Sequence, residues 1–149
     1  MFNEIIELKE LTMETMGAIC KLEVSESQKN FVASNVYSLA QAYFAKDDAW
    51  FRGIYTDNEP VGFIMLSMRP DEGKYYLWRY MVDKKHQRKG YGKKALELVI
   101  EFVKKQPNAK KLSLSYVKGE GSPEEFYKKL GFENTGEIDE GEHVMVLEF

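Results

Sequence analysis

The residues from Lys84 to Lys94 have the composition of a site for an anionic, phosphate-bearing ligand. All charged residues in this stretch are positive, although the formal net charge of the chain is -3. They are Lys84, Lys85, Arg88, Lys89, Lys93 and Lys94. Gly90 and Gly92 would let backbone amides approach a phosphate closely. A periodic helical pattern follows from Ala95 to about Lys105, and a helix N-terminus carries unpaired N–H groups with roughly half a positive charge.

Two common nucleotide-binding motifs do not fit this loop. Gly90 to Ala95 formally matches the dinucleotide pattern G-x-G-x-x-G/A, but a basic loop of about six residues separates the preceding strand from Gly90. The ribose-binding acid expected about 20 residues further on is replaced by Lys110, Lys111 and Leu112. A Walker A pattern does not occur. A purely structural glycine turn would leave the six basic residues unexplained.

The pattern that fits is Q-x-x-G-x-G, formed by Gln87, Gly90 and Gly92. It resembles motif A of the GNAT family of N-acetyltransferases, which bind acetyl-CoA. The segment 78–83 looks like the fourth strand of that family, and Phe126 to Phe132 is similar to its recurrent F-Y-x-x-x-G-F segment. The motifs stand in the order and spacing of the family, and the resemblance covers residues 1–149.

The resemblance implies acetyl-CoA as the cosubstrate and no metal. It implies that the fourth strand splays from the fifth, so that backbone groups of Met81 and Val82 can pair with the pantetheine arm and donate to the acetyl carbonyl. Many family members carry Asn at the position of Ser122, which leaves the contact of Ser122 with CoA open. The implied cofactor-binding residues are Met81, Val82, Asp83, Gln87, Arg88, Lys89, Gly90, Tyr91, Gly92, Lys93, Lys94 and Ser122.

Acetyl transfer to an amine requires two proton movements. A primary alkylamine with a pKa near 10.4 is only about 0.1% neutral at pH 7, so it must lose a proton before it attacks. The thiolate of CoA must gain one as it leaves. By resemblance, Tyr127 is the candidate general acid, since a phenol with a pKa near 10 keeps its proton at pH 7. The base is left open among Glu23, Glu26, Asp71, Glu72, the tyrosines of the central strand and a water chain.

Within the family, the order of residues from Glu23 to Ala40 and the segment 78–81 resemble bacterial diamine and polyamine acetyltransferases. This implies an acceptor such as spermidine or spermine, with Glu23, Glu26 and Trp78 as candidate substrate-binding residues. The acidic segments 23–26, 47–48 and 137–142 would suit a polycation. The alternatives are a protein N-terminus, a lysine or an aminoglycoside as acceptor, or a CoA-binding regulatory module without turnover.

The composition is that of a cytoplasmic protein with a single domain over residues 1–149. No apolar run approaches the roughly 20 residues of a membrane span, and the N-terminus lacks a signal-peptide pattern. A pI near 5.5 argues against nucleic-acid binding. Cys20 is the only cysteine and, with two distant histidines, predicts no disulfide and no metal site. The aromatic share of 13% and the family resemblance allow a homodimer.

Hydrophobic periodicity predicts the elements that must position these residues. Strands are expected at 2–9, 50–55, 61–68, 75–82, 111–116, 132–138 and 144–149. Helices are expected at 12–23, capped by Thr12, at 28–46, at 95–105, and from a cap at Ser122 to Gly131. The first helix should bury Met13, Met16, Ile19, Cys20 and Leu22, and the second Val32, Val36, Leu39, Ala40 and Tyr43.

This order of elements predicts an α/β (α+β) architecture. Three consecutive hairpin strands should be antiparallel, whereas the strands on either side of the crossover helix at 95–105 should be parallel. Together with the resemblance, we expect a GNAT fold: a mixed, mostly antiparallel sheet of six to seven strands, helices on both faces, and a splayed central parallel pair.

Overall fold

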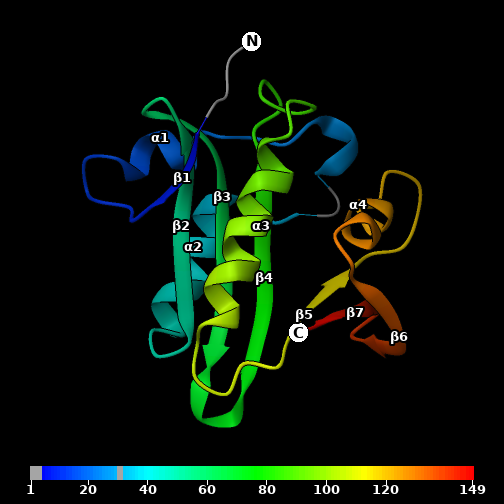
Figure 1. Cartoon of the computed structure of the whole chain (residues 1–149). Helices are drawn as coiled ribbons and strands as arrows, with labels where there is room; N and C mark the ends of the chain where they lie inside the picture. Colours follow the sequence, from blue (N-terminus) through cyan, green and yellow to red (C-terminus); the bar gives the residue numbers. More distant parts are fainter. Residues whose placement is uncertain (1–4, 30–31) are drawn as a thin grey trace.

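The computed structural model describes residues 5–29 and 32–149 and contains a seven-stranded sheet in the order β1-β2-β3-β4-β5-β7-β6 (Figure 1). The strands are β1 (Ile6–Lys9), β2 (Ala49–Thr56), β3 (Glu59–Arg69), β4 (Lys74–Val82), β5 (Lys111–Tyr116), β6 (Glu133–Asp139) and β7 (Glu142–Glu148). The α-helices are α1 (Met16–Cys20), α2 (Asn35–Phe44), α3 (Tyr91–Lys104) and α4 (Glu124–Lys129). Two 3-10 turns, η1 (Glu26–Gln28) and η2 (Pro70–Glu72), complete the described elements.

The central strands β4 and β5 form the parallel pair of the sheet, and the other neighbouring strands are antiparallel. In the described part of the chain, β4 and β5 pair only at Tyr76–Ser113 and Leu77–Leu114. Strand β4 continues to Val82 without β5 beside it. The predicted splay is therefore confirmed, and one edge of β4 is left without a strand partner after Leu77.

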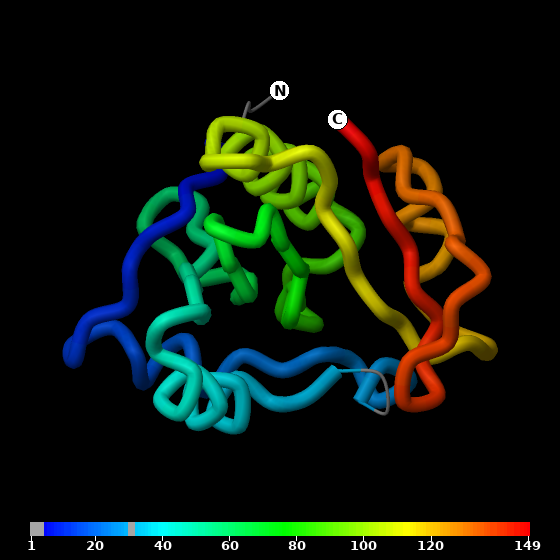
Figure 2. Tube along the Cα trace, turned by 90° about the horizontal axis from the view of Figure 1, so that it is seen from below, coloured from blue at the N-terminus to red at the C-terminus, as the bar shows by residue number. Residues whose placement is uncertain are grey.

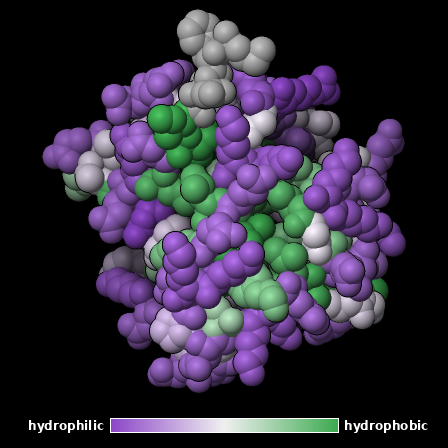
Figure 3. Space-filling model, in the orientation of Figure 1, coloured by the Kyte–Doolittle hydropathy of each residue, from purple (hydrophilic) through white to green (hydrophobic). Residues whose placement is uncertain are grey.

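Helices cover both faces of the sheet, as predicted (Figure 2). One core lies between the sheet and α3 with α4, and includes Leu96, Val99 and Phe132. The other lies beneath α1 and α2 and includes Ile19 and Phe63. Side chains of α3 repeat on one side at helical spacing, which gives this helix its buried stripe. Hydrophilic side chains cover much of the outer surface on the α3 side (Figure 3).

A β-bulge at Trp78 changes which side chains of β4 face α3. Met65 of β3 is opposite Arg79, and the next residue, Leu66, is opposite Leu77, so Trp78 has no partner in the register. An extra residue in a strand reverses the alternation that follows it. Leu77 lies in the α3 core before the bulge, and Tyr80 packs against the same core after it. The bulge therefore directs Tyr80 toward the N-terminus of α3.

The first helix is shorter than predicted and begins later. Thr12 does not cap it; the N–H of Thr15 donates to Oγ1 of Thr12 (3.2 Å), and the N–H of Thr12 donates to Oγ1 of Thr15 (2.9 Å). These reciprocal bonds form a turn, and α1 starts at Met16. Ile19 is buried as expected, but Met13 is 83% exposed and Met16 is also exposed, so the prediction that both face inward is wrong.

The second predicted helix, 28–46, is also wrong at its start; residues 30–31 within it lie outside the described part of the chain. Helix α2 begins at Asn35 because Ser34 caps it, accepting from the N–H of Tyr37 (3.1 Å). Its inward side chains include Asn35, which donates to the carbonyl of Ile19 (2.8 Å), and Ser38, which donates to that of Ser34 (2.9 Å). Satisfied polar groups can be buried.

The predicted buried face of the second helix is only partly correct, because Val32 and Leu39 pack against the core as predicted. Val36, Ala40 and Tyr43 are exposed, and Ala42 is buried instead. Hydrophobicity alone could not reveal this orientation, because two of the three buried residues of α2, Asn35 and Ser38, are polar and are buried through hydrogen bonds.

The remaining elements agree with the predictions within a few residues where they are described. Residues 2–4 of the first predicted strand, 2–9, lie outside the described part of the chain, and β1 covers Ile6–Lys9. Helix α3 begins four residues early, at Tyr91. Pro123, rather than Ser122, is the residue before α4, although Oγ of Ser122 still accepts from the N–H of Glu124 (3.2 Å). No helix among the described residues is long and apolar enough to cross a membrane.

Candidate active site

The loop between β4 and α3 has the backbone geometry of an anion site. Arg88 (φ 65°) and Gly90 (φ 82°) both adopt the left-handed conformation. Such residues turn successive N–H groups toward a common concavity. Gly90 precedes α3 and supplies no side chain to cap it. The first turn of α3, including Gly92 and Lys93, borders a cavity of about 480 Å³. A negative charge is favoured at this helix end.

Most of the predicted cofactor-binding residues come together around this first cavity. Those that line it are Met81, Val82, Gln87, Arg88, Gly90, Tyr91, Gly92, Lys93 and Ser122. Asp83, Lys89 and Lys94 are not among its lining residues. The buried carboxylate of Asp83 accepts from the N–H groups of Glu23 (2.8 Å) and Lys85 (3.2 Å). It therefore holds the backbone of the loop in place without lining the cavity.

Gln87 connects three parts of the chain at this cavity. Its Nε2 donates to the carbonyl of Val82 (2.9 Å) at the end of β4 and to Oε1 of Gln28 (2.7 Å) in η1. The bond to Val82 fixes the loop against the strand, and the bond to Gln28 fixes the connection between α1 and α2. Gln87 thus positions the cavity wall as well as lining it.

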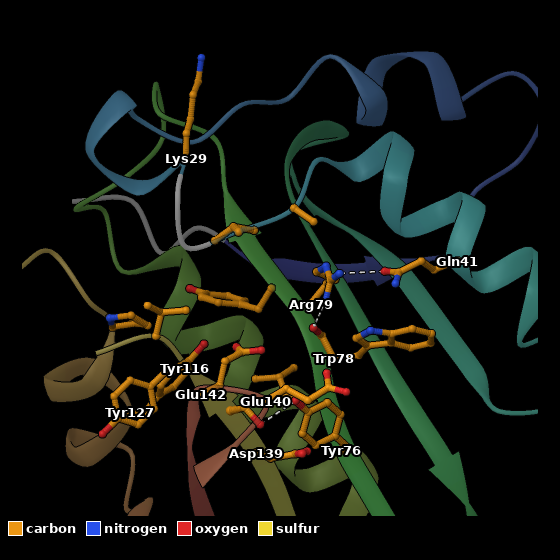
Figure 4. Close-up of a pocket in the computed structure, with 17 residues that line it drawn as sticks. Lys29, Gln41, Tyr76, Trp78, Arg79, Tyr116, Tyr127, Asp139, Glu140 and Glu142 are labelled. Atoms are coloured by element: carbon orange, nitrogen blue, oxygen red, sulfur yellow. Dashed lines mark hydrogen bonds between the residues drawn. The ribbon is translucent and has the colours of Figure 1, made fainter. Parts of the chain in front are cut away.

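A second cavity, of about 560 Å³, is lined by residues of β4 and β5 and contains no residue of the basic loop 84–94 in its lining. Three acidic residues of the β6–β7 turn line it: Asp139, Glu140 and Glu142. Its aromatic lining includes Tyr76, Trp78 and Tyr116, and its cationic lining is Lys29 and Arg79. The acidic side chains gather beside Tyr76 and Tyr116 (Figure 4). The predicted acidic segment 137–142 therefore reaches a cavity.

Tyr80 and Tyr127 line both cavities and stand where the two meet. Burial raises the pKa of the Tyr127 phenol well above its ordinary value, and the nearby Tyr76 adds to this shift. Burial also raises the pKa of Tyr80, with a further contribution from Tyr127. Tyr80 stacks on Phe126 of α4 with ring centroids 5.9 Å apart. Both phenols therefore hold their protons at neutral pH.

Tyr76 is the other tyrosine of β4 that lines the second cavity. Its hydroxyl donates to Oγ of Ser115 (2.8 Å), which connects β4 to β5 at the point of splay. Burial is the main cause that raises the pKa of Tyr76, and the negative charges of Glu142 and Asp139 act in the same direction. It is therefore protonated at neutral pH.

The predicted substrate-binding residues divide into two groups. Trp78 lines the second cavity, where the bulge places it. Glu23 and Glu26 line neither cavity; Glu23 pairs with Lys84 (3.3 Å) and Glu26 with Lys29 (2.8 Å). The role of these two carboxylates in binding stays a prediction.

Two of the residues that the sequence offers as candidates for the general base lie away from both cavities. Asp71 and Glu72 lie in η2, before the first residue of β4, and line neither cavity. Glu72 pairs instead with Arg69 and Lys74. The site lies toward the opposite end of β4, from Trp78 to Val82.

Arg79 and Gln41 were not found from the sequence. Nη2 of Arg79 donates to Oε1 of Gln41 on α2 (2.8 Å), and Nη1 donates to the carbonyl of Trp78 at the bulge (2.9 Å). Burial lowers the pKa of this guanidinium. No sequence signal pairs these residues, because the contact depends on the orientation of α2. In the described chain, no cluster of three or more His, Cys, Asp or Glu side chains could hold a metal ion.

A splayed β4–β5 pair beside a basic glycine loop and a helix N-terminus, with buried tyrosines where the two cavities meet, is the arrangement predicted for an acetyltransferase of the GNAT type. Residues 13–132 match the model of the acetyltransferase (GNAT) family. The chain belongs to that family and is an acyltransferase.

Two relatives in Bacillus subtilis extend over nearly the whole chain. One, from strain 168, is a spermine/spermidine N(1)-acetyltransferase and is 31% identical. The other, from subspecies natto, is a probable spermine N(1)-acetyltransferase and is 32% identical. Each comparison covers 96% of this chain and 98% of the relative.

Solved structures share the fold. The PaiA N-acetyltransferase of Thermoplasma acidophilum, solved in complex with coenzyme A, has a TM-score of 0.73 and 20% identity. The comparison covers 97% of this chain and 99% of that one. This similarity confirms the predicted fold class.

Proposed function

We propose that this protein transfers the acetyl group of acetyl-CoA to a primary amine of a diamine or polyamine such as spermidine or spermine. The observation that carries the proposal is the pair of cavities joined at Tyr80 and Tyr127. One is bordered by a basic loop and a helix N-terminus, and the other by acidic and aromatic side chains. The two ends of the site therefore suit a polyanionic donor and a polycationic acceptor.

The first cavity would hold acetyl-CoA. Its pyrophosphate would accept from the amides of the loop from Arg88 to Lys93, with basic side chains nearby. The free edge of β4 at Met81 and Val82 would pair with the pantetheine arm, as an added strand pairs with a sheet edge. An N–H of this edge would then receive the acetyl carbonyl, where negative charge develops.

The second cavity would hold the acceptor. Asp139, Glu140 and Glu142 would attract the ammonium groups that do not react, and ammonium groups also bind favourably over the faces of tyrosine and tryptophan rings. The similarity to spermine and spermidine acetyltransferases from Bacillus subtilis supports the same acceptor class. Arg79 and Lys29 would disfavour a second positive charge at their own side of the cavity.

The chemistry follows from this placement. The amine gives its proton to water in the open acceptor cavity, and the neutral nitrogen attacks the acetyl carbon. A C–N bond forms, the C–S bond breaks, and the thiolate takes the phenol proton of Tyr127. The raised pKa of Tyr127 keeps that proton in place until sulfur leaves. The acetylated nitrogen releases its extra proton to water, and the Tyr127 phenolate takes a proton back from water, so that the amide is neutral and the phenol is restored. The single cysteine and the use of acetyl-CoA favour the cytoplasm as the site of the reaction. We infer that residues 1–149 form one domain, which contains both cavities.

A thiol-release assay with acetyl-CoA tests the proposal. The acceptor panel should contain spermine, spermidine, shorter diamines, free lysine, an N-terminal peptide and an aminoglycoside. We expect the highest kcat/KM with a polyamine. Turnover on the peptide or the aminoglycoside, without turnover on any polyamine, would contradict the acceptor class while leaving the acetyltransferase itself intact.

A further inference from the structure

Arg79 lines the second cavity and forms no ion pair with a carboxylate of the described residues. Arg52 of β2 and Arg69 of β3 each have such a pair, at 3.6 Å and 3.1 Å. Arg88 has none in the described chain either, and it lines the first cavity, where the anionic donor would bind. A partly buried charge without a counter-ion is unfavourable. An anionic ligand would supply the counter-ion that Arg79 lacks.

Uncharged acceptors hold the Arg79 guanidinium in place. Nη1 donates to the carbonyl of Trp78 (2.9 Å), and Nη2 donates to Oε1 of Gln41 (2.8 Å). Nε is buried and has no hydrogen-bond partner in the part of the chain that the structure describes. Because a guanidinium carries five N–H groups, each Nη atom keeps one further donor. The side chain is therefore fixed from two directions while its charge stays uncompensated, as in a preorganised binding site.

The second cavity keeps its positive and negative side chains apart. Figure 4 shows Arg79 and Gln41 separate from the acidic side chains of the β6–β7 turn, which are Asp139, Glu140 and Glu142. A polyamine would pair with the acidic side chains but would leave the guanidinium without an anion. A ligand that carries both ammonium groups and a carboxylate would match both sides of the cavity.

We propose that Arg79 forms a subsite for a carboxylate, so that the second cavity also accepts a diamino carboxylic acid. The carboxylate would accept from the remaining N–H groups of the guanidinium, whose planar shape suits a carboxylate. The second ammonium group would lie toward Asp139 and Glu142, and the reacting amine would lie beside Tyr127, where the cavities meet. This inference rests on the proposed acetyl transfer and adds an acceptor class to the polyamines.

The reaction at the amine is the same as for a polyamine. The side-chain amine of the diamino acid gives one proton to water, and the neutral nitrogen attacks the acetyl carbon of acetyl-CoA. The C–N bond forms, the C–S bond breaks, and the nitrogen releases its second proton to water. The thiolate takes a proton from Tyr127, which regains one from water. The products are CoA and an N-acetylated diamino acid that keeps its carboxylate.

A comparison of acceptors that differ at the carboxyl position tests the subsite. Lysine carries a carboxylate there, lysinamide carries an uncharged amide, and cadaverine carries neither group. We expect the kcat/KM of lysine to exceed that of the other two about tenfold, as for a hydrogen bond between charged groups in a partly buried site. Equal values for the three acceptors, or a preference for cadaverine, would overturn the proposal.

Three variants separate carboxylate binding from support of the fold. Arg79→Met removes the charge and should lower the lysine-to-cadaverine ratio of kcat/KM about tenfold. Gln41→Glu keeps the shape of position 41 but gives Arg79 an internal carboxylate partner, so it should lower the same ratio. Arg52→Met is the matched control, because Arg52 lines neither cavity, and should leave the ratio unchanged. If Arg79 only supported the fold, Arg79→Met would lower kcat/KM for all acceptors together and keep the ratio, which would contradict the subsite.

The same acceptors distinguish this inference from the proposed function. Turnover of spermine without a preference for lysine over cadaverine overturns the carboxylate subsite alone. Turnover of lysine without turnover of any polyamine overturns the polyamine class alone. Calorimetric titration of the CoA complex with lysine measures the subsite without turnover, and Arg79→Met should raise the Kd for lysine about tenfold. An unchanged Kd would overturn the subsite even in an enzyme that acetylates none of these amines.

Discussion

The phenol oxygen of Tyr80 occupies the place where a side chain on residue 92 would begin. A β-carbon built at Gly92 would overlap this oxygen and lie 3.4 Å from Cγ2 of Val82. The glycine therefore lets α3 start directly against β4. Tyr80 reaches this position because the bulge at Trp78 turns it toward the α3 core. The start of α3 and the junction of the two cavities thus depend on the same contact.

This contact predicts a compensating pair of substitutions. Gly92→Ala should destabilise the protein by about 1–3 kcal/mol, because its methyl group overpacks against the phenol oxygen. Adding Tyr80→Phe removes that oxygen and should recover much of the loss. Urea unfolding of both single variants and the double variant measures the coupling. Strictly additive effects would show that the two residues do not interact.

Tyr127→Phe should lower kcat by about 100-fold or more, the usual range for loss of a general acid. The phenyl ring still fills the buried site, so folding and CoA affinity should change little. Steady-state kinetics with the acceptor panel and the shift in melting temperature caused by CoA measure the two effects. An unchanged kcat across the pH range would remove Tyr127 from the mechanism.

The stability of the protein should fall at alkaline pH. Burial raises the folded-state pKa of Tyr80 and Tyr127, whereas tyrosines of the unfolded chain ionise near pH 10. Above that pH the unfolded state binds fewer protons than the folded state, so stability present below about pH 10 is lost as pH rises. Each tyrosine contributes up to about 1.4 kcal/mol per pH unit. Urea titrations should give a shallower decline for Tyr80→Phe; identical slopes would contradict this account.

Gly90→Asp should abolish CoA binding, because the carboxylate would face the phosphates at the N-terminus of α3. Gly136→Asp is the matched control: Gly136 has φ 85° against 82° for Gly90, and neither position has a heavy atom within 4 Å of an added β-carbon. Both substitutions therefore carry similar backbone strain. Calorimetric titration with CoA should detect binding only in the Gly136 variant, and retained affinity in the Gly90 variant would refute the phosphate-loop assignment.

Neutralising the acidic lining should weaken the binding of polyamines. Asp139→Asn and Glu142→Gln should each raise the polyamine KM by about two- to fivefold, as expected for partly exposed ion pairs, with a larger effect at low salt. The KM for acetyl-CoA should stay the same. Glu137→Gln serves as the control because Glu137 belongs to the same hairpin but does not line the cavity. Equal effects of all three substitutions would indicate general attraction by the hairpin rather than a defined subsite.

The sequence predicted helix α3 and the central strands, but it predicted neither the orientation of α2 nor the bulge in β4. Hydrophobic spacing located α3 and the central strands because each buries one strongly apolar side. It failed for α2, which buries Asn35 and Ser38 through hydrogen bonds to Ile19 and Ser34 and leaves Val36 exposed. It failed also at Trp78, because a bulge depends on the register with β3 rather than on the sequence of β4 alone.

The sequence by itself determined the order of strands and helices, the basic glycine loop, the acidic segment 137–142 and the family. These are local properties, set by residue type, spacing and charge. Only the tertiary structure decided that Tyr80 and Tyr127 stand where the two cavities meet, that Asp139 and Glu142 line the same cavity as Tyr76, and that Arg79 bonds Gln41. Such juxtapositions join residues far apart in the chain, and they follow from strand register, bulge position and helix orientation, which the packing of the whole chain fixes.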